Sequence, residues 1–375
     1  MVRTVKTSLP QKFGINPWLV ILLTAPIPFL ALGYFTIKWY QENSNLTKTN
    51  RYFVQRQNTV LAYDAMEVSS GISDLLEKAA RDLKVMSLLP PTVSEYQAFY
   101  RAQMSDYTQF YTENEPPKSI PLPFFNQQMI LSLSGKVLLH LWDGEPQKHF
   151  TSLESCQTKD LCDRELLNKA MTLKVGEYWY GRVMRYYSAE GKREDTERSS
   201  LNVVYRGTNA IYLLGIDFRH LKDHLTTPVF PYEAKRNLLQ AYAQGNYIYI
   251  VDSNHAIIAH PKYWHQAGID RVSGEYVAPM KTDDDEGKHP LNIAAYQGER
   301  LKSYFDRLLR KSFLQKGVDV FQAPNLGGVN RVVAVAPIYL SKGQFEKSSG
   351  VFGYAIMGCS VEYFEEPTEK LIPYY

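Results

Sequence analysis

A group of residues near the middle of the chain has side chains that could together hold a small charged molecule. An arginine can bind a carboxylate through two parallel hydrogen bonds, aromatic rings can enclose a cation, and an aspartate can pair with an ammonium group. These residue types together suit an amino acid, an amine or a carboxylate as ligand. The alternative is that the aromatic residues pack in a sheet and the arginines lie on a solvated face. The candidate ligand-binding residues are Tyr178, Trp179, Tyr180, Arg182, Arg185 and Asp217.

A second set of chemically capable residues follows a short apolar run and contains Asp252, His255 and His260. Two imidazoles and a carboxylate can bind zinc. However, Asp252-Ser253-Asn254-His255 also has the composition of a turn, in which the Asp side chain satisfies backbone N–H groups. His260 lies beyond that turn, so the two histidines need not converge. The pattern favours a structural turn, and we predict no metal and no cofactor.

An acidic run, Asp283 to Glu286, offers oxygen ligands for Ca²⁺. It lacks the alternation and the glycine placement of an EF-hand loop, so a solvated acidic loop is the favoured interpretation. The chain also has no HExxH, GxSxG or P-loop motif. We therefore predict that it is not an enzyme.

Cys156 and Cys162 flank the short segment CQTKDLC. In an oxidising compartment these two cysteines could form a disulfide, which would contribute roughly 2–3 kcal/mol by the loop-entropy model. Zinc is less favoured because no second pair of ligands lies nearby. Cys359 is interpreted as a buried small residue.

The N-terminus predicts where the protein resides. Residues 1–16 carry Arg3, Lys6 and Lys12 and no acid, and Trp18 to Ile37 is uncharged and mostly apolar. About 20 such residues can cross a bilayer of about 30 Å, and the basic head favours a cytoplasmic N-terminus. We therefore predict a transmembrane anchor over 17–40, with the rest of the chain outside the cytoplasm. A cleaved signal peptide is the alternative, although its apolar core would usually be shorter.

A long helix is predicted after the anchor, within the region 41–125. Residues 41–89 contain no proline, and Pro90-Pro91 would end the helix. Such a helix would be about 70 Å long. A second helix is expected over Thr92 to Tyr111, followed by a linker that reaches Pro123. Gaps of three and four place the apolar residues of the long helix on one face: Leu61, Ala65, Val68, Ile72, Leu75, Leu76, Ala79, Leu83 and Met86.

The remaining residues predict an α+β fold with two antiparallel sheet modules, 126–225 and 226–365, and a tail, 366–375. The length of 375 residues allows two domains. A net charge of +3 argues against a nucleic-acid binder. In the first module, strands are expected at 126–133, 136–142, 177–187, 201–206 and 210–218, and a helix at 164–172. In the second, a hairpin is expected at 245–261, a helix at 299–313, and strands at 317–322, 331–339 and 350–359.

Three short segments resemble the extracytoplasmic Cache sensor family. The segment GNYIYIVDSNHAIIAHP reads as a strand, an Asp-containing turn, a second strand and the pair His260-Pro261. LLGIDF resembles the closing strand of a membrane-distal module, and RVVAVAPIYL with GVFGYAIMGCS resembles the closing hairpin of a membrane-proximal one. The resemblance implies a double Cache fold, with two PAS-like modules along a long stalk helix and a ligand pocket in the distal module. Amino-acid-binding members carry related Tyr, Arg, Trp-Tyr and Asp residues, but in this chain Trp179-Tyr180 precede Arg182.

This resemblance implies a membrane-anchored sensor that binds a small ligand outside the cytoplasm. It would lie in the inner membrane with a single span and most of the chain in the periplasm. The chain shows no output domain, so a partner protein is expected to receive the signal, and the long helix could form a homodimer. The alternative function is a structural or assembly protein of the envelope that uses the same fold without a ligand. Bulky side chains filling the distal pocket would favour that alternative.

Overall fold

The computed structural model describes most of the chain after the first 25 residues. Two compact units, Met1–Arg56 and Gln57–Tyr375, make up the protein, and helix α2 begins in the first and ends in the second. The described residues are 26–109, 118–147, 151–155, 163–187, 199–217, 220, 247–260, 266–270, 276–286, 288–312, 318–324, 330–346 and 350–360.

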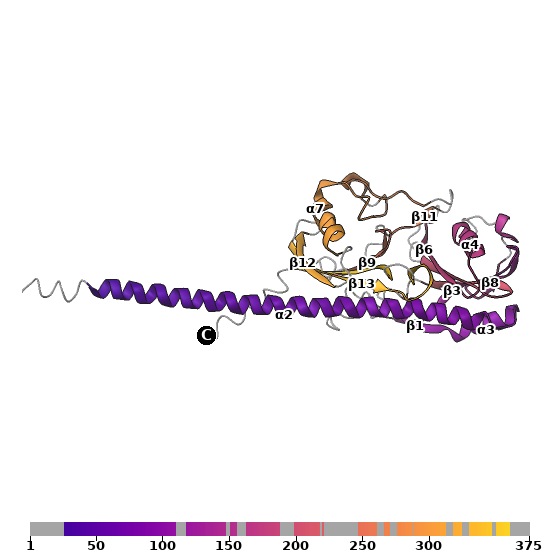
Figure 1. Cartoon of the computed structure of the whole chain (residues 1–375), viewed down its shortest axis with the longest axis horizontal. Coiled ribbons are helices and arrows are strands. Elements are labelled where there is room, and N and C mark those ends of the chain that lie inside the picture. The colour runs from indigo at the N-terminus through magenta and orange to yellow at the C-terminus, as the bar shows by residue number, and fades with distance from the viewer. Residues whose placement is uncertain are drawn as a thin grey trace, which may run out of the picture. The chain divides into compact units, whose positions relative to one another are not determined.

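The long helix is confirmed as α2, Pro26–Met86, which is unbroken over 61 residues (Figure 1). It ends shortly before Pro90-Pro91, and the Ser87 N–H donates to the Leu83 carbonyl at 3.0 Å to close the last turn. Every apolar residue that the spacing placed on one face, from Leu61 to Met86, is buried. The helical period alone was therefore sufficient to identify the buried face.

The predicted anchor, 17–40, lies partly outside the described residues, which begin at residue 26. Within the described part of the chain, no helix combines the length and the apolar content that a membrane span requires.

The segment after α2 differs from the prediction. Helix α3, Val93–Ala102, begins at Thr92, whose hydroxyl accepts the Glu95 N–H at 3.4 Å. It stops well before Tyr111, and the chain continues as strand β1, Met104–Gln109, antiparallel to β2, Lys118–Pro123. The helical prediction over 104–109 and the linker prediction over 118–123 were therefore wrong. The backbone N–H and C=O groups of β1 pair with β2 and not within a helix, so this tertiary pairing overrides the local helical pattern.

The first sheet contains all the strands predicted between 126 and 218, with short additions. Neighbouring strands are antiparallel except β11, which pairs with β6 in parallel. The strand order is β11-β6-β7-β8-β3-β4-β5. Helix α4, Arg164–Met171, lies where the sequence predicted it. The strands are β3 (Phe125–Ser132), β4 (Val137–Trp142), β5 (Glu145–Pro146), β6 (Tyr178–Tyr187), β7 (Ser199–Arg206), β8 (Ala210–Asp217) and β11 (Ile269–Asp270).

The second sheet is antiparallel throughout, in the order β10-β9-β14-β13-β12. The predicted opening hairpin and closing strands are confirmed. Helix α7, Glu299–Arg307, continues as a π-helical segment, Leu308–Ser312. Short 3-10 turns are η1 (Leu153–Ser155), η6 (Asp283–Asp285) and η8 (Gly343–Phe345). The strands are β9 (Tyr247–Asp252), β10 (Ile257–Ala259), β12 (Asp319–Pro324), β13 (Asn330–Tyr339) and β14 (Val351–Ser360).

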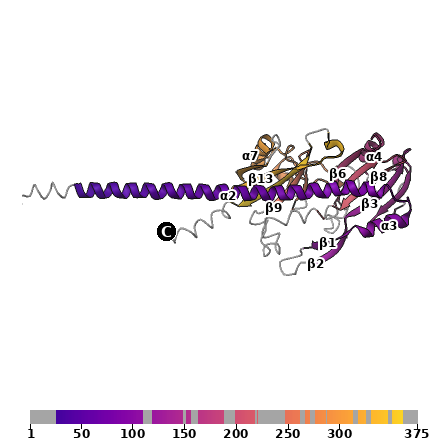
Figure 2. The same ribbon diagram turned by 60° about the horizontal axis from the view of Figure 1, so that its bottom comes forward.

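The two larger sheets of the second unit each pack one face on α2 (Figure 2). One core cluster joins the buried face of α2 to side chains from each sheet, such as Leu214 of β8 and Ile250 of β9. The other face of the first sheet packs on α4, and that of the second on α7. Alternation along β9 follows this arrangement, because Ile250 belongs to the α2 side whereas Tyr249 and Val251 belong to the α7 side.

Truncating Leu76 to alanine should destabilise both modules together. Leu76 is fully buried in the core that α2 shares with the two sheets. Leu→Ala changes in such cores cost about 2–5 kcal/mol. Chemical denaturation of the full chain measures the change. Met66→Ala, at a position of α2 that is 48% exposed, is the matched control and should cost less than about 1 kcal/mol. Equal losses for the two variants would contradict this account of α2.

Candidate functional site

A cavity of about 600 Å³ lies where the first module meets the turns of the second. Its volume is within the range of small-molecule sites, roughly 300–1,000 Å³. The first module contributes α4 and β6, and the second contributes the turn after β9, Tyr276, and η8 with its neighbours. The polar and aromatic residues of its wall are Asp163, Glu165, Asn168, Lys169, Thr172, Trp179, Tyr180, Arg182, Asp252, Ser253, Asn254, Tyr276, Gln344, Phe345 and Phe352.

A β-bulge in β6 forms one wall of the cavity. Tyr180 pairs with Val203 and Val183 pairs with Leu201, so β6 has one residue more than β7 over this stretch. The bulged residues are Gly181 and Arg182. A Cβ on Gly181 would lie 3.0 Å from Cδ2 of Leu166 on α4 and 3.1 Å from a backbone oxygen of β7. Glycine therefore lets α4 approach the strand, and the bulge redirects the next side chain, that of Arg182.

Arg182 is a cation that interacts with the carboxylates of the cavity wall. Its Nη2 lies 3.8 Å from Oε1 of Glu165, and its guanidinium lies 5.0 Å from the centre of the Tyr276 ring. The Arg182 side chain is 52% exposed and lines the cavity, so some of its guanidinium N–H groups are accessible to a ligand. Arg182 therefore remains a candidate for binding a carboxylate in the way that guanidinium groups prefer.

Asp163 is a half-buried carboxylate at the start of α4. Its Oδ1 accepts the Leu166 N–H at 3.0 Å and so caps the helix. Burial raises the pKa of Asp163, and the nearby Glu165 charge adds to the increase, whereas the Leu166 hydrogen bond and Arg182 oppose it. The site thus holds a carboxylate whose charge is poorly solvated.

Asp252 supplies a second such carboxylate from the other module. Its Oδ1 accepts the N–H groups of Asn254 and Ala256, each at 2.9 Å, which confirms its predicted role in the turn. Burial raises the pKa of Asp252, against the effects of these hydrogen bonds and of Arg182. With Glu165, the cavity wall carries three carboxylates against the two cations Arg182 and Lys169. Its net negative charge favours a ligand with a positively charged group.

Trp179 lies on the α4 side of the sheet and already has a cation on its ring. Nζ of Lys169 lies 4.4 Å from the ring centre. The sequence predicted that the Trp179 ring would contact a cation of the ligand, but the cation on this ring is Lys169 of the protein itself.

Among the sequence-predicted residues, Trp179, Tyr180 and Arg182 line the cavity and Tyr178 does not. The Tyr178 ring contacts that of Tyr205, with ring centres 4.7 Å apart and an interplanar angle of 35°. Tyr180 is only 1% exposed, and within the described part of the chain its hydroxyl has no hydrogen-bond partner. Burial raises its pKa, and the Glu77 charge on α2 adds to the increase. Tyr180 belongs to the core cluster that contains the buried face of α2. Arg185 is in β6, but its side chain lies outside the described residues.

Asp217 does not line the cavity but lies in a buried polar cluster on the first sheet. It is 1% exposed and directly opposite Ser200 in the register, so the two side chains share a face. Oγ of Ser200 lies 3.1 Å from Oδ1 of Asn126 and from Oδ1 of Asn202. A Cβ on Gly215 would lie within 2.9 Å of these three oxygens, so a larger residue there would displace the cluster. Ligand binding by Asp217 and Arg185 stays a prediction.

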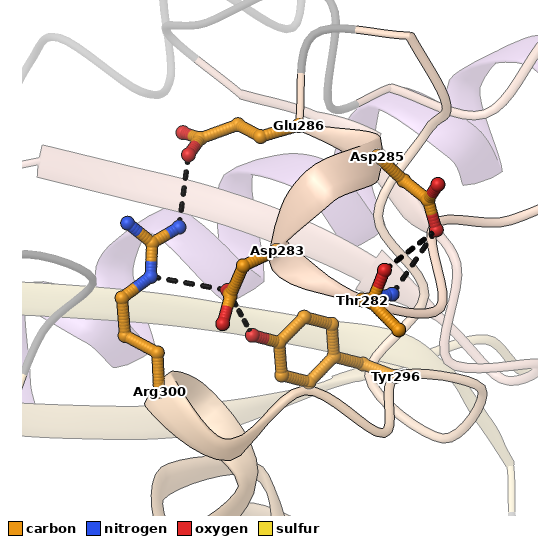
Figure 3. Close-up of polar contacts among 6 residues, drawn as sticks. All are labelled: Thr282, Asp283, Asp285, Glu286, Tyr296 and Arg300. Carbon is orange, nitrogen blue, oxygen red and sulfur yellow. Dashed lines mark hydrogen bonds and ion pairs between the residues drawn. The ribbon is translucent and has the colours of Figure 1, made fainter.

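The acidic loop is held by partners within the protein (Figure 3). Arg300 donates to Asp283 at 3.1 Å and to Glu286 at 2.8 Å, and the Tyr296 hydroxyl bonds Asp283. Asp285 accepts the backbone N–H groups of Lys281 and Thr282, which lowers its pKa. The carboxylates therefore order the loop against α7 and give no support to a calcium site.

The two histidines that were considered as metal ligands have different surroundings. His260 is buried, with its ring centre 5.5 Å and 5.6 Å from those of Tyr247 and Tyr249. His255 occupies the turn at φ 65°. Among the residues that the structure describes, no three His, Cys, Asp or Glu side chains gather to hold a metal. The Cys156–Cys162 pair lies outside the described residues, and Cys359 is buried with a free thiol.

Several cavity residues were missed by the sequence analysis. Asp163 precedes a predicted helix, and an Asp at that position is a recognisable cap signal. Asp252 was considered as a turn residue or a metal ligand but not as part of the ligand pocket, and Tyr276 and Gln344 lie in segments with no distinguishing pattern. Their contribution depends on contacts between distant parts of the chain.

Comparison with protein-family models and with curated proteins finds no match. Solved structures do match. The periplasmic sensory domain of the Campylobacter jejuni chemoreceptor Tlp1 matches with a TM-score of 0.49 and 9% identity, over 84% of this chain and 99% of that chain. The sensory domain of the Campylobacter jejuni chemoreceptor Tlp3 with isoleucine bound gives 0.46 and 8%, over 84% and 98%.

The ligand-binding domain of the Pseudomonas aeruginosa PAO1 amino acid chemoreceptor PctB, in complex with L-Arg, matches with a TM-score of 0.43 and 10% identity, over 84% of this chain and 92% of that chain. These structural matches cover most of the chain. The chain is thus similar to sensory and ligand-binding domains of chemoreceptors.

Proposed function

We propose that this protein is an extracytoplasmic sensor that binds a small ligand with an ammonium or similar cationic group in the cavity between its two modules. The observation that carries the proposal is the pair of half-buried carboxylates in the cavity wall, Asp163 from the first module and Asp252 from the second. Arg182 beside them provides a place for a carboxylate on the same ligand. An amino acid or an amine fits this arrangement best.

The open cavity supports ligand binding over the alternative of a ligand-free envelope protein. That alternative expects bulky side chains to fill the site, whereas about 600 Å³ is free. The signal would pass through α2, because residues from both modules pack on its buried face. A ligand shifts this arrangement only if it binds one conformation more tightly than another. We infer that a partner protein receives the change, and exposed residues of α2 such as Tyr63 and Met66 offer it a surface.

Removing the charge of Asp163 or Asp252 should abolish most of the affinity for a cationic ligand without harming the fold. Asparagine keeps the oxygen that caps α4 in Asp163→Asn, and the oxygen that holds the turn in Asp252→Asn. Loss of one charged hydrogen bond weakens binding by about 10–100-fold. Calorimetric titration of the full chain with a panel of amino acids and amines measures this effect. Thermal stability of the unliganded variants should be equal to or above that of wild type, since a desolvated charge is removed.

Asp284→Asn is the matched control for this experiment. Asp284 is an exposed acid of the η6 turn and is outside the cavity wall. It should bind every panel member as wild type does. Wild-type affinity in both cavity variants, for a ligand that binds wild type, would remove Asp163 and Asp252 from the site.

The affinity for a cation should fall at mild acidity, whereas the stability of the unliganded chain should change in the opposite direction. Both carboxyl pKa values are raised above their ordinary range. Between the ordinary and the raised pKa, the folded state holds more protons than the unfolded state, so this contribution to stability decreases as the pH rises through that window. A bound cation needs the ionised carboxylates, so its affinity rises over the same window. Ligand titrations over a pH series measure the affinity, and unfolding over the same series measures the stability of the unliganded chain. The doubly substituted Asp163→Asn, Asp252→Asn variant should show neither pH trend.

We further propose that the apolar run Trp18–Ile37 anchors the chain in a membrane. The described end of this region supports it, because Leu32, Phe35 and Ile37 are between 61% and 66% exposed. Apolar side chains exposed in such density mark a surface that needs an apolar environment.

Alkaline extraction of cell membranes tests the anchor. The wild-type chain should remain in the membrane pellet. Replacing Leu32 and Phe35 together by lysine raises the cost of insertion, because a lysine costs about 2.5–3.5 kcal/mol at the centre of a span and less toward its end, so this variant should appear in the soluble fraction. Gln41→Lys, just beyond the predicted span, is the control and should remain in the pellet. Extraction of the wild-type chain itself would overturn the anchor.

A further inference from the structure

A side-chain amide from the second module pairs with the backbone of the strand that carries Arg182. Gln344 lies in η8, between β13 and β14. Its Nε2 donates to the Tyr180 carbonyl at 2.8 Å, and its Oε1 accepts the Tyr180 N–H at 3.0 Å. Strand β11 pairs with β6 only at Tyr186 and Tyr187. Gln344 therefore occupies the edge of β6 at Tyr180 in the way that a neighbouring strand would.

This pair of bonds lies at the edge of the β-bulge. Tyr180 immediately precedes Gly181 and Arg182, which are the bulged residues. Gln344 and the adjacent Phe345 both line the cavity. A bulge is a local break in strand pairing, so its geometry depends on what fixes the backbone on either side. On the cavity side, that support is the Gln344 amide.

The fit of η8 against β6 requires glycine at position 343. Gly343 has a φ of +67°, and a Cβ there would lie 3.1 Å from the Tyr180 ring and 3.2 Å from the Tyr178 carbonyl oxygen. Any larger residue would be strained by its backbone conformation and would press on β6. Gly343 therefore lets the loop lie close enough for Gln344 to reach both backbone groups.

The same loop also holds α2. Oγ of Ser341 donates to Oε1 of Glu77 at 2.6 Å, and the Ser341 N–H donates to the same oxygen at 3.3 Å. Ser341 and Gln344 are three residues apart, so a single turn of chain connects the cavity wall to the stalk helix. The bulge is therefore connected to α2 through two hydrogen-bonded contacts joined by this short stretch of chain.

We propose that Gln344 is a positioning residue of the ligand site: its amide fixes β6 at Tyr180, so that the bulge presents Arg182 to the cavity, and Ser341 links the same loop to Glu77 of α2. This inference rests on the proposed function, because it gives the site a means of acting on the helix. Gln344 acts through Arg182, and its removal should therefore have no further effect on binding once Arg182 is gone.

Hydrogen exchange in the full chain tests the positioning role without any ligand. Gln344→Met keeps the length of the side chain and removes both hydrogen bonds. The Tyr180, Gly181 and Arg182 amides should then exchange at least about tenfold faster, since local opening becomes easier, and peptides of α2 around Glu77 should also exchange faster. Gln147→Met is the matched control, because Gln147 also bonds a backbone carbonyl, that of Glu145, but lies outside the site. Unchanged exchange in the bulge would overturn the proposal, and unchanged exchange in α2 would overturn its link to the helix.

Binding of L-lysine, used as the probe, separates positioning from a general structural role. Its ammonium groups suit the two aspartates and its carboxylate suits Arg182. Gln344→Met should weaken binding about tenfold, the size expected for a lost hydrogen-bonded constraint, whereas Gln344→Met combined with Arg182→Ala should bind as Arg182→Ala alone. Additive losses would overturn the assignment of Gln344 to Arg182. Absence of L-lysine binding to wild type would count against the proposed function, and the exchange results would then decide the positioning role.

Discussion

The buried face of α2 is the constraint on which the rest of the second unit depends. Each sheet covers its outer face with its own helix, α4 or α7, but both use α2 to cover the inner face. Because one rigid helix supports both sheets, the spacing of the modules is fixed along its length. A cavity formed by turns of one module and a helix of the other is therefore coupled to α2 by packing alone. Hydrogen bonds such as that between Ser341 and Glu77 add a specific contact to this shared core.

The sequence could predict those parts of the fold that local patterns determine. Apolar residues with a period of 3.6 gave the buried face of α2, and β-branched runs separated by turn residues gave the main strands of both sheets. The prediction failed at Met104–Gln109, where pairing with β2 overrides a helical pattern. A strand partner lies outside any local window, so no inspection of residues 92–111 alone could have shown it.

The candidate site was less accessible to prediction because it is assembled from distant segments. Trp179, Tyr180 and Arg182 were identified because a single strand concentrates aromatic and cationic residues. Gln344 is 164 positions away from its partner Tyr180, and an isolated glutamine in a loop carries no signal of its own. Asp217 was grouped with the arginine by residue type, yet the register of β7 and β8 places it in a polar cluster beside Ser200. Local chemistry thus identified one wall of the cavity, and the tertiary structure supplied the others.

The two half-buried aspartates of the cavity wall, Asp163 and Asp252, are the basis of the proposed binding site. Each already satisfies backbone N–H groups through one oxygen, which is a structural task that asparagine performs equally well. The backbone hydrogen bonds and the nearby Arg182 favour the ionised carboxyls, but burial opposes them more strongly, as the raised pKa values of both carboxyls indicate. The cationic ligand that we propose would stabilise both ionised carboxylates against this cost of burial.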